Sequence, residues 1–243
     1  MKNVVIVSGV LLVISSVMFS PAYAQVTQNW VKSISGVGWK DDRLRACAVD
    51  AAGNVYVTGA TPPLSGNIED VMTLKYNSSG VEQWRVRYDG SYGSDYGEAL
   101  TVDASGNVYV AAYSRGPSNG DYVIIKYNAS GTQQWLTRYD GPGANVDDPK
   151  AIRLNSAGYL CVTGTTYSTT SLNDITTVFL DPSDGTVILQ DTYNGAGNSD
   201  DAVAAMAVDG SGNFFVVGTA KSTVFLGSED IVTIKYDATG NWQ

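Results

Sequence analysis

Four aspartates recur at one position of a repeated sequence pattern, each of them four residues before an alanine. They are Asp42, Asp95, Asp147 and Asp201. Four carboxylates gathered around one opening could bind a hard cation such as Ca²⁺, which takes oxygen ligands. An aspartate that opens a strand also accepts hydrogen bonds from the turn backbone, and no dedicated calcium loop is present. The pattern favours a structural role, leaves a calcium site as the alternative, and predicts no other cofactor.

A pair of carboxylates can also hydrolyse a glycosidic bond. That chemistry needs two carboxyl groups about 5–10 Å apart, one of them with a raised pKa. Aspartates that recur in every copy are better explained by the repeat, because a catalytic carboxylate should differ from its equivalents. The glutamates are Glu69, Glu82, Glu98 and Glu229. No catalytic residue is assigned, and an enzyme is kept only as an alternative.

Aromatic residues occupy one repeated position near the end of each copy. The position holds Trp30, Trp84, Trp135 and Trp242, with Leu189 in the third copy. Exposed tryptophans could stack on sugar rings, but a position shared by all copies normally serves the core of the repeat. We therefore predict packing between the rims of neighbouring units.

A second pair of repeated positions carries opposite charges. Asp50, Asp103 and Asp209 match Lys75, Lys126 and Lys235 in the same copies. In the third copy both charges are lost together, because Asn155 and Phe179 stand there. Since an unpaired buried charge is costly, the pattern suggests that these aspartates and lysines form ion pairs, with coincidence in one divergent copy as the alternative.

The composition limits the partners that the protein can have. The net charge is −9, the isoelectric point is about 4.4 and there is no histidine. An acidic surface argues against nucleic acid and anionic membranes as partners, and the lack of histidine removes the commonest general base and zinc ligand. Two cysteines, Cys47 and Cys161, fall in different apolar positions of the repeat. We predict that both are buried free thiols.

The N-terminal segment has the features of a secretory signal. Lys2 precedes a mostly apolar run, residues 4–19, and a small-residue cleavage pattern ends at Ala24. The run is short for a transmembrane anchor, which is the alternative. The pattern predicts a protein that is secreted, periplasmic or on the cell surface, with no membrane insertion after cleavage.

The elements that must position these residues are short strands in four copies of a unit of about 53 residues. In the second copy we expect strands at 98–103, 108–112, 121–127 and 134–139, separated by turns that contain Asn or Asp with Gly. Repeated four-stranded antiparallel sheets covered on both faces indicate a β-propeller with one blade per copy. The first strand of each blade is expected at the centre and the fourth at the rim.

The repeat also resembles a known family. The runs Asp-x-Ser-Gly-Asn-Val-Tyr-Val, Asp-Tyr-Val-Ile-Ile-Lys-Tyr-Asn, Ser-Gly-x-x-x-Trp and Arg-Tyr-Asp-Gly are similar to the bacterial β-propeller repeat family called SBBP. The resemblance covers 29–243 and implies an exported bacterial propeller, with no catalytic residues to transfer.

The predicted division is a signal peptide at 1–24 and β-propeller repeats at 25–243. The latter comprise a rim strand at 25–40, blade 1 at 41–90, blade 2 at 91–141, blade 3 at 142–195 and an incomplete blade 4 at 196–243. The N-terminal strand could complete the last blade and close a four-bladed ring. Alternatively, the chain is part of a larger propeller, which another chain or self-association could complete.

The function predicted from these patterns is a secreted, non-catalytic binding or scaffolding module with an unknown protein or glycan ligand. The alternatives are a carboxylate-dependent glycoside hydrolase, because propellers can host one, and a structural segment of a longer surface protein.

Overall fold

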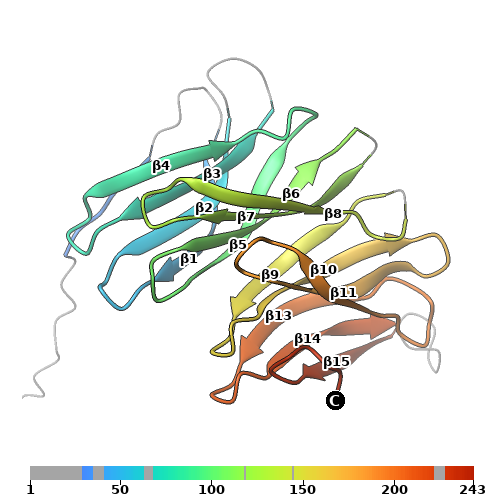
Figure 1. Ribbon diagram of the computed structural model, residues 1–243. Helices are drawn as coiled ribbons and strands as arrows, with labels where there is room; N and C mark the ends of the chain where they lie inside the picture. Colours follow the sequence, from blue (N-terminus) through green and yellow to red (C-terminus); the bar gives the residue numbers. More distant parts are fainter. Residues whose placement is uncertain (1–28, 35–40, 63–67, 118, 144, 222–227) are drawn as a thin grey trace, which may run out of the picture. The chain divides into compact units, whose positions relative to one another are not determined.

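The computed structural model describes residues 29–34, 41–62, 68–117, 119–143, 145–221 and 228–243. These residues hold fifteen β-strands, all within one compact unit, Lys32–Gln243. The strands form four antiparallel sheets that follow one another along the chain, and we call them blades 1 to 4 (Figure 1). The predicted all-β class is therefore confirmed. Among the described residues, none forms a helix long and apolar enough to cross a membrane.

Each blade is built from strands that are consecutive in sequence. Blade 1 holds β1 (Arg43–Val49), β2 (Val55–Thr61), β3 (Asp70–Tyr76) and β4 (Glu82–Tyr88). Blade 2 holds β5 (Asp95–Val102), β6 (Val108–Arg115), β7 (Gly120–Tyr127) and β8 (Gln133–Tyr139). Blade 3 holds β9 (Asp148–Leu154), β10 (Leu160–Ser168), β11 (Leu172–Leu180) and β12 (Val187–Tyr193). Blade 4 holds β13 (Ala202–Val208), β14 (Phe214–Lys221) and β15 (Glu229–Tyr236).

The most regular run of the repeat is a turn between the first two strands of each blade. In blade 1 the Asp50 carboxylate accepts the backbone N–H groups of Ala52 and Asn54, both at 2.9 Å, and Gly53 supplies a φ of +78°. A short acceptor side chain and a glycine are what such a turn requires. The same bonds recur at Asp103, Asn155 and Asp209. The repeated motif is therefore explained by the requirements of this turn.

The first strands of the blades lie side by side, as predicted. β1 packs on β5, β5 on β9, and β9 on β13, and we call these four the inner strands. Three hydrophobic clusters fill the space between neighbouring blades, and their buried side chains come from both blades at each junction. The inner strands are thus held by the cores on either side of them.

Blade 4 presents an uncovered face. Val71, Tyr122 and Ile175 hold equivalent positions and are at most 1% exposed, because each packs on the following blade. Ile231 holds the same position in blade 4 and is 88% exposed. Among the described strands, no packing comparable to the other junctions joins β13 to β1. The described residues therefore do not show a closed ring.

The fourth position of blade 4 is not filled by the N-terminal segment in the described residues. Residues 29–34 contain no strand, and the pairing seen beside β15 is a single bridge between Tyr236 and Trp242. The rest of the predicted rim strand and the whole predicted signal, 1–24, lie outside the described residues.

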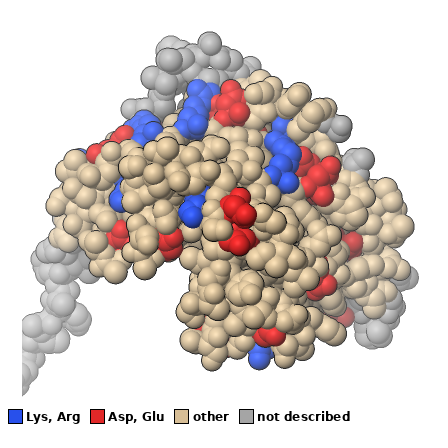
Figure 2. All heavy atoms as spheres, in the orientation of Figure 1, with Lys and Arg blue, Asp and Glu red and all other residues tan. Residues whose placement is uncertain are grey.

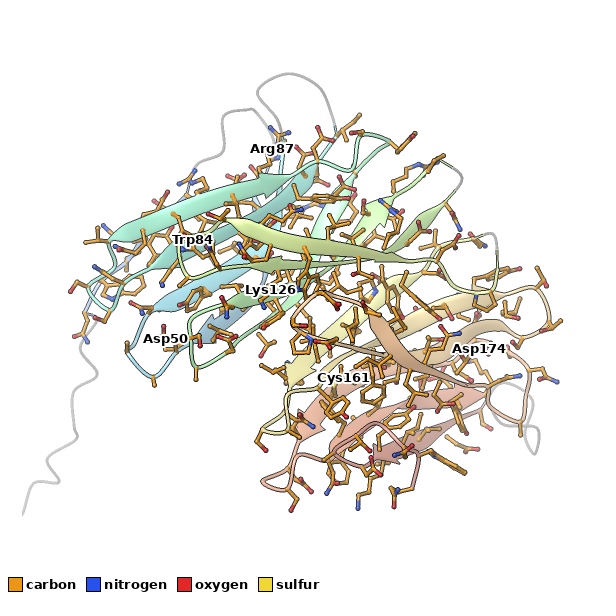
Figure 3. The ribbon with its side chains drawn as sticks, in the orientation of Figure 1. Asp50, Trp84, Arg87, Lys126, Cys161 and Asp174 are labelled. Carbon is orange, nitrogen blue, oxygen red and sulfur yellow. The ribbon has the colours of Figure 1, made fainter. Side chains whose placement is uncertain are left out.

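Both cysteines are free thiols, but only one of them is buried. Cys161 is fully buried in blade 3 (Figure 3). Cys47 is exposed, although its equivalent Met206 is 3% exposed against blade 3. The predicted burial of Cys47 is wrong because its position is covered by the preceding blade, and none of the described strands precedes blade 1.

The predicted ion pairs between repeated aspartates and lysines do not form in the described residues. Asp50 is occupied by its own turn and by the Tyr56 hydroxyl at 2.9 Å. The Lys126 ammonium donates to the Pro182 carbonyl of blade 3 at 2.7 Å, and its Nζ lies 5.3 Å from the centre of the Tyr109 ring. The lysine thus bridges neighbouring blades, and its partner is a carbonyl.

Two of the repeated tryptophans, Trp84 and Trp135, join the rims of neighbouring blades, which supports the packing interpretation for them, whereas Trp242 is 72% exposed. The Trp84 indole N–H donates to the Ala129 carbonyl at 3.0 Å, and Trp135 donates to Pro182 at 3.1 Å. Trp84 therefore lies against a turn of blade 2 (Figure 3).

This contact makes Gly131 a sensitive position. Gly131 and Gly158 both have positive φ, at +83° and +86°, so alanine is strained at either site. A Cβ on Gly131 would lie 2.8 Å from the Trp84 ring, whereas nothing lies within 4 Å of one on Gly158. We expect Gly131→Ala to destabilise the protein by about 1–3 kcal/mol more than Gly158→Ala, measured by urea unfolding. Equal losses would contradict a packed Trp84.

Candidate functional site

The four aspartates of the predicted ring clamp the chain where one blade joins the next. Asp95 accepts the backbone N–H of Gly90 at 2.6 Å and of Arg115 at 3.2 Å. Asp147 does the same with Gly141 and Tyr167, at 2.6 and 2.9 Å. Equivalent bonds hold Asp201, whereas Asp42 accepts the Thr61 hydroxyl at 2.7 Å. Three of the four thus tie a linker to the second strand of their own blade.

Two groups of carboxylates in the described residues are close enough to share a cation. They are Asp70, Asp89 and Asp95 at one junction, and Asp121, Asp140 and Asp147 at the next. Each group contains one residue of the predicted ring together with two aspartates of the preceding blade. Arginines already pair with Asp70 and Asp121. A calcium site made by the four ring aspartates together stays a prediction.

A different position brings unlike charges together on the inner strands. Arg45, Glu98, Lys150 and Ala204 are equivalent in the repeat. Each lies at a β-bulge, so it is skipped in the pairing between its inner strand and the second strand of its blade. A bulge re-aims its side chain relative to the regular strand. Because the four residue types differ, this position is not explained by a scaffold that all blades share.

Glu98 and Arg45 form an ion pair between the inner strands of blades 1 and 2. The Glu98 side chain is 6% exposed, so the pair is mostly shielded from solvent on the carboxylate side. The Arg45 Cζ lies 5.0 Å from the centre of the Tyr96 ring, a distance typical of a cation–π contact. Tyr96 in turn stacks on Tyr113, with 5.6 Å between ring centres. These contacts fix the orientation of Arg45 and hence of Glu98.

Asp148, at the start of β9, is the second carboxylate of this cluster. Burial, followed by the negative charge of Glu98, raises the pKa of Asp148 to about 6, and the nearby cations Lys150 and Arg45 oppose the rise. Two carboxyl groups therefore stand in unlike environments: Glu98 is bound to an arginine, and Asp148 keeps its proton to a higher pH than an ordinary aspartate does, up to about pH 6. This difference is the one that separates an acid from a base in glycoside hydrolysis.

A cavity of about 280 Å³ lies along the inner strands beside these residues, and we call it the channel pocket. Its charged lining consists of Arg45, Glu98, Lys150 and Arg153, and apolar side chains of all four inner strands, mostly alanines, complete it. The channel pocket thus offers a carboxylate and three cations to a ligand.

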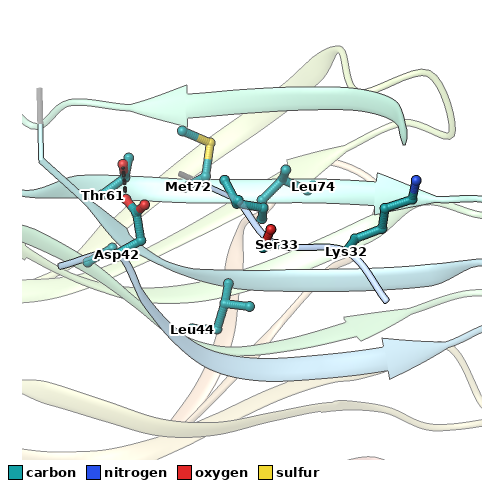
Figure 4. A pocket seen from close by; sticks show the side chains of 9 residues that line it. Lys32, Ser33, Asp42, Leu44, Thr61, Met72 and Leu74 are labelled. Atoms are coloured by element: carbon teal, nitrogen blue, oxygen red, sulfur yellow. Dashed lines mark hydrogen bonds between the residues drawn. The ribbon is translucent and has the colours of Figure 1, made fainter. Parts of the chain in front are cut away.

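A second cavity, of about 220 Å³, lies on blade 1 (Figure 4). Leu44, Met72 and Leu74 line it together with residues 32–34. Asp42 is its single carboxylate, and it is engaged by Thr61. The lining of the channel pocket also holds one carboxylate, Glu98, but a second carboxyl group, Asp148, lies within electrostatic reach of it. Because paired-carboxylate chemistry needs two acidic groups, the channel pocket is the better candidate.

Acidic and basic side chains are intermixed on the face of the molecule that Figure 2 shows. Several acidic groups pair with arginine or lysine, among them Asp121 with Arg138 at 2.7 Å and Glu229 with Lys221 at 2.7 Å. On this face the negative net charge is spread out and does not form one acidic field.

The comparison of repeats missed Glu98 and Asp148 because it searched for positions that all copies share. The signal was nonetheless present in the sequence. Glu98 stands where other copies have Arg45, Lys150 and Ala204, so it is the carboxylate that differs from its equivalents. Asp148 similarly stands where blade 2 has Tyr96.

No protein-family model matches the chain, and a search of curated proteins finds no match. Among solved structures, the Hadza microbial sialidase Hz136 has a similar fold, with a TM-score of 0.57 and 11% identity over 83% of this chain. The chain covers 46% of that sialidase, a little under half of its length. The resemblance to the SBBP repeats stays a prediction.

Two further structures have lower TM-scores. An α-L-arabinofuranosidase from Clostridium thermocellum has a TM-score of 0.46 at 13% identity, with 82% of this chain and 70% of that chain covered. A GH43 endo-arabinanase from Bacillus licheniformis has a TM-score of 0.43 at 11% identity, with 81% and 74% covered.

These findings overturn the prediction of a non-catalytic binding or scaffolding module that is not an enzyme. The solved structure with the similar fold is named as a sialidase, so a fold of this type does not imply a non-catalytic module. At 11% identity the similarity to the sialidase shows the fold alone. The activity of this chain must therefore be argued from its own residues.

Proposed function

We propose that this protein is a carboxylate-dependent glycoside hydrolase whose active site is the channel pocket. One observation carries the proposal: Asp148, with a pKa raised to about 6, lies within electrostatic reach of Glu98, which Arg45 holds in an ion pair. Both carboxylates occupy positions where the other blades have different residues, so the repeat does not explain them.

Asp148 is the general acid in this proposal. It gives its proton to the glycosidic oxygen as the bond between that oxygen and the anomeric carbon breaks. Burial keeps the proton on Asp148 up to about pH 6, which suits an acid that works in weakly acidic solution.

Glu98 is the second carboxylate. It either attacks the anomeric carbon, giving a glycosyl-enzyme that water then hydrolyses, or takes a proton from the water that attacks directly. In both courses one water is consumed, its hydroxyl group stays on the anomeric carbon, and Asp148 regains a proton before the next turnover. Arg45 positions Glu98, and the Tyr96 ring positions Arg45.

For the fold, we propose that blades 1 to 4 form part of a propeller with more than four blades. Two observations support it. Ile231 is exposed where its equivalents in blades 1 to 3 are buried, and the described part of β13 lacks the packing on β1 that joins the other inner strands.

A panel of chromogenic glycosides tests the activity. We expect release of the chromophore from at least one glycoside, and Glu98→Gln to lower kcat/KM by at least about 10²-fold. Glu82→Gln is the matched control, because Glu82 lies on the outer strand β4 and pairs with Arg85 in solvent. NMR detection of the first anomer released then assigns the stereochemical course. No turnover on any glycoside, or unchanged turnover in Glu98→Gln, would reject the proposal.

A further inference from the structure

We infer that the channel pocket binds a sugar that carries a negative charge, as a uronic acid does. The inference rests on the proposed function, because it names the substrate class of the same site. It starts from an imbalance of charge: three cations and one carboxylate line the pocket, in a chain whose net charge is −9.

Two of the three cations form no ion pair within the described part of the chain. Arg45 is paired with Glu98, but no ion pair of the described residues involves Lys150 or Arg153. The Arg153 guanidinium donates to the carbonyl of the neighbouring residue Ile152 at 2.8 Å, and both Lys150 and Arg153 are exposed. Lys150 interacts electrostatically with Asp148, but neither cation is held in an ion pair, so both charges can still reach a ligand in the pocket.

Comparison of the blades shows that the packing of the inner strands does not require these two cations. The position of Arg153 holds Ala48, Thr101 and Ala207 in the other blades, and that of Lys150 holds Ala204 in blade 4. All these inner strands pack in the same way, so no packing role requires a positive charge in blade 3. Both cations belong to β9, the strand that also supplies Asp148.

The size and chemistry of the pocket favour a carboxylate-bearing sugar. A volume of about 280 Å³ lies just below the usual range for ligand pockets, about 300–1,000 Å³, and suits a ligand no larger than a single sugar unit. A guanidinium presents parallel N–H donors that match a carboxylate, and the lysine adds a point charge. Hydroxyl groups alone would leave both charges unneutralised.

Equilibrium binding of free monosaccharides to the intact protein tests the inference. The probes are glucuronate against glucose and galacturonate against galactose, with glucose 6-sulfate to distinguish a carboxylate from other anionic groups. We expect each uronate to bind at least about tenfold more tightly than its neutral partner, since a charge-assisted hydrogen bond is worth about that factor. The preference should shrink as ionic strength rises.

Variants of the cations connect the preference to the pocket. Arg153→Gln and Lys150→Gln should each remove most of the preference, and Arg153→Lys should keep part of it. Arg85→Gln is the control, because Arg85 pairs with Glu82 on the outer strand β4. Tight binding of the sulfate supports an anionic ligand without requiring a carboxylate. Equal affinity for charged and neutral sugars, or a preference that survives Arg153→Gln, would overturn the inference.

The two proposals can fail separately. If no glycoside is hydrolysed but uronates bind in a way that depends on Arg153, the catalytic proposal fails and the binding site stands. If glycosides are hydrolysed through Glu98 with no preference for charged sugars, the substrate class is wrong and the activity stands.

Discussion

Asp148→Asn is expected to abolish most of the turnover and, at pH 8, to make the protein more stable. Asparagine keeps the shape of the side chain and removes the proton that the glycosidic oxygen needs, so kcat should fall by about 10²–10⁴-fold. At pH 8 the buried Asp148 carboxyl is charged at a cost in stability, and a neutral asparagine removes that cost.

The sign of the stability change follows from the pKa. Burial and the charge of Glu98 raise the pKa of Asp148 from 3.8 to about 6, so the unfolded chain loses the proton first. Stability from the bound proton is present in full below about pH 4 and is lost as pH rises through 6. A difference of about two in pKa corresponds to about 3 kcal/mol. After solvent screening of this partly exposed group, we expect a gain of about 1–2 kcal/mol for the variant at pH 8.

Urea unfolding of both proteins at pH 4 and pH 8 measures the effect. The two should differ at pH 8 and come close together at pH 4, where folded Asp148 is protonated and the unfolded carboxyl is about half protonated. Asp41→Asn, a change of an exposed aspartate earlier in the chain, should leave stability within about 0.5 kcal/mol. A variant that is less stable than the wild type at pH 8 would show that Asp148 serves the scaffold. In the wild type, the alkaline limb of kcat should fall near pH 6.

Arg138→Met is expected to cost about 2–4 kcal/mol of stability, a large loss for a single ion pair. Arg138 donates to Asp121 at 2.7 Å and to the carbonyl and hydroxyl of Ser114 at 3.0 and 2.9 Å. The Asp121 side chain is 6% exposed, so removing the arginine leaves a buried charge without its partner. The loss should be seen as a lower urea midpoint at constant slope.

A double variant distinguishes a lost ion pair from lost packing. Arg138→Met combined with Asp121→Asn should recover at least half of the stability, because the buried charge is then gone. The exposed pair of Arg85 and Glu82 supplies the control: Arg85→Met should cost less than about 1 kcal/mol. If the double variant is no more stable than Arg138→Met, the arginine acts through packing.

Blade 3 also stabilises a buried aspartate near the start of its third strand, but with a different donor. There Thr192 replaces the arginine of blades 1 and 2, and the carboxylate of Asp174 accepts the Ser171 hydroxyl at 2.5 Å. Asp174 is 3% exposed (Figure 3). A buried aspartate at this junction is thus retained with either a cation or a neutral donor.

The strands and turns could be predicted from the sequence because they depend on local chemistry. Asp50 bonds to backbone groups two and four residues away, so a short run of sequence contains both partners. The position of the inner strands followed from the repeat, since equivalent units must pack in equivalent ways.

Features that depend on a neighbouring blade were not predictable in the same way. The burial of Cys47 was wrong because its repeat position is covered by a preceding blade. The predicted partner of Lys126 was wrong because the ammonium donates to the Pro182 carbonyl, 56 residues away. Every residue has a backbone carbonyl, so the residue types do not reveal such a partner. The cluster of Glu98 and Asp148 was missed because a comparison of repeats looks for residues shared by all copies, and each of these carboxylates occurs at its position in one copy only.

The bulge shared by the inner strands has a consequence for how such a protein can acquire new activities. A bulged residue pairs with no residue on the neighbouring strand, so exchanging its side chain leaves the ladder of hydrogen bonds intact. Four such places face one pocket, and they already hold an arginine, a glutamate, a lysine and an alanine. Each duplicated blade therefore adds one bulge position whose side chain can be exchanged without disturbing the strand pairing. A new specificity can evolve by single substitutions at these positions while the scaffold stays constant.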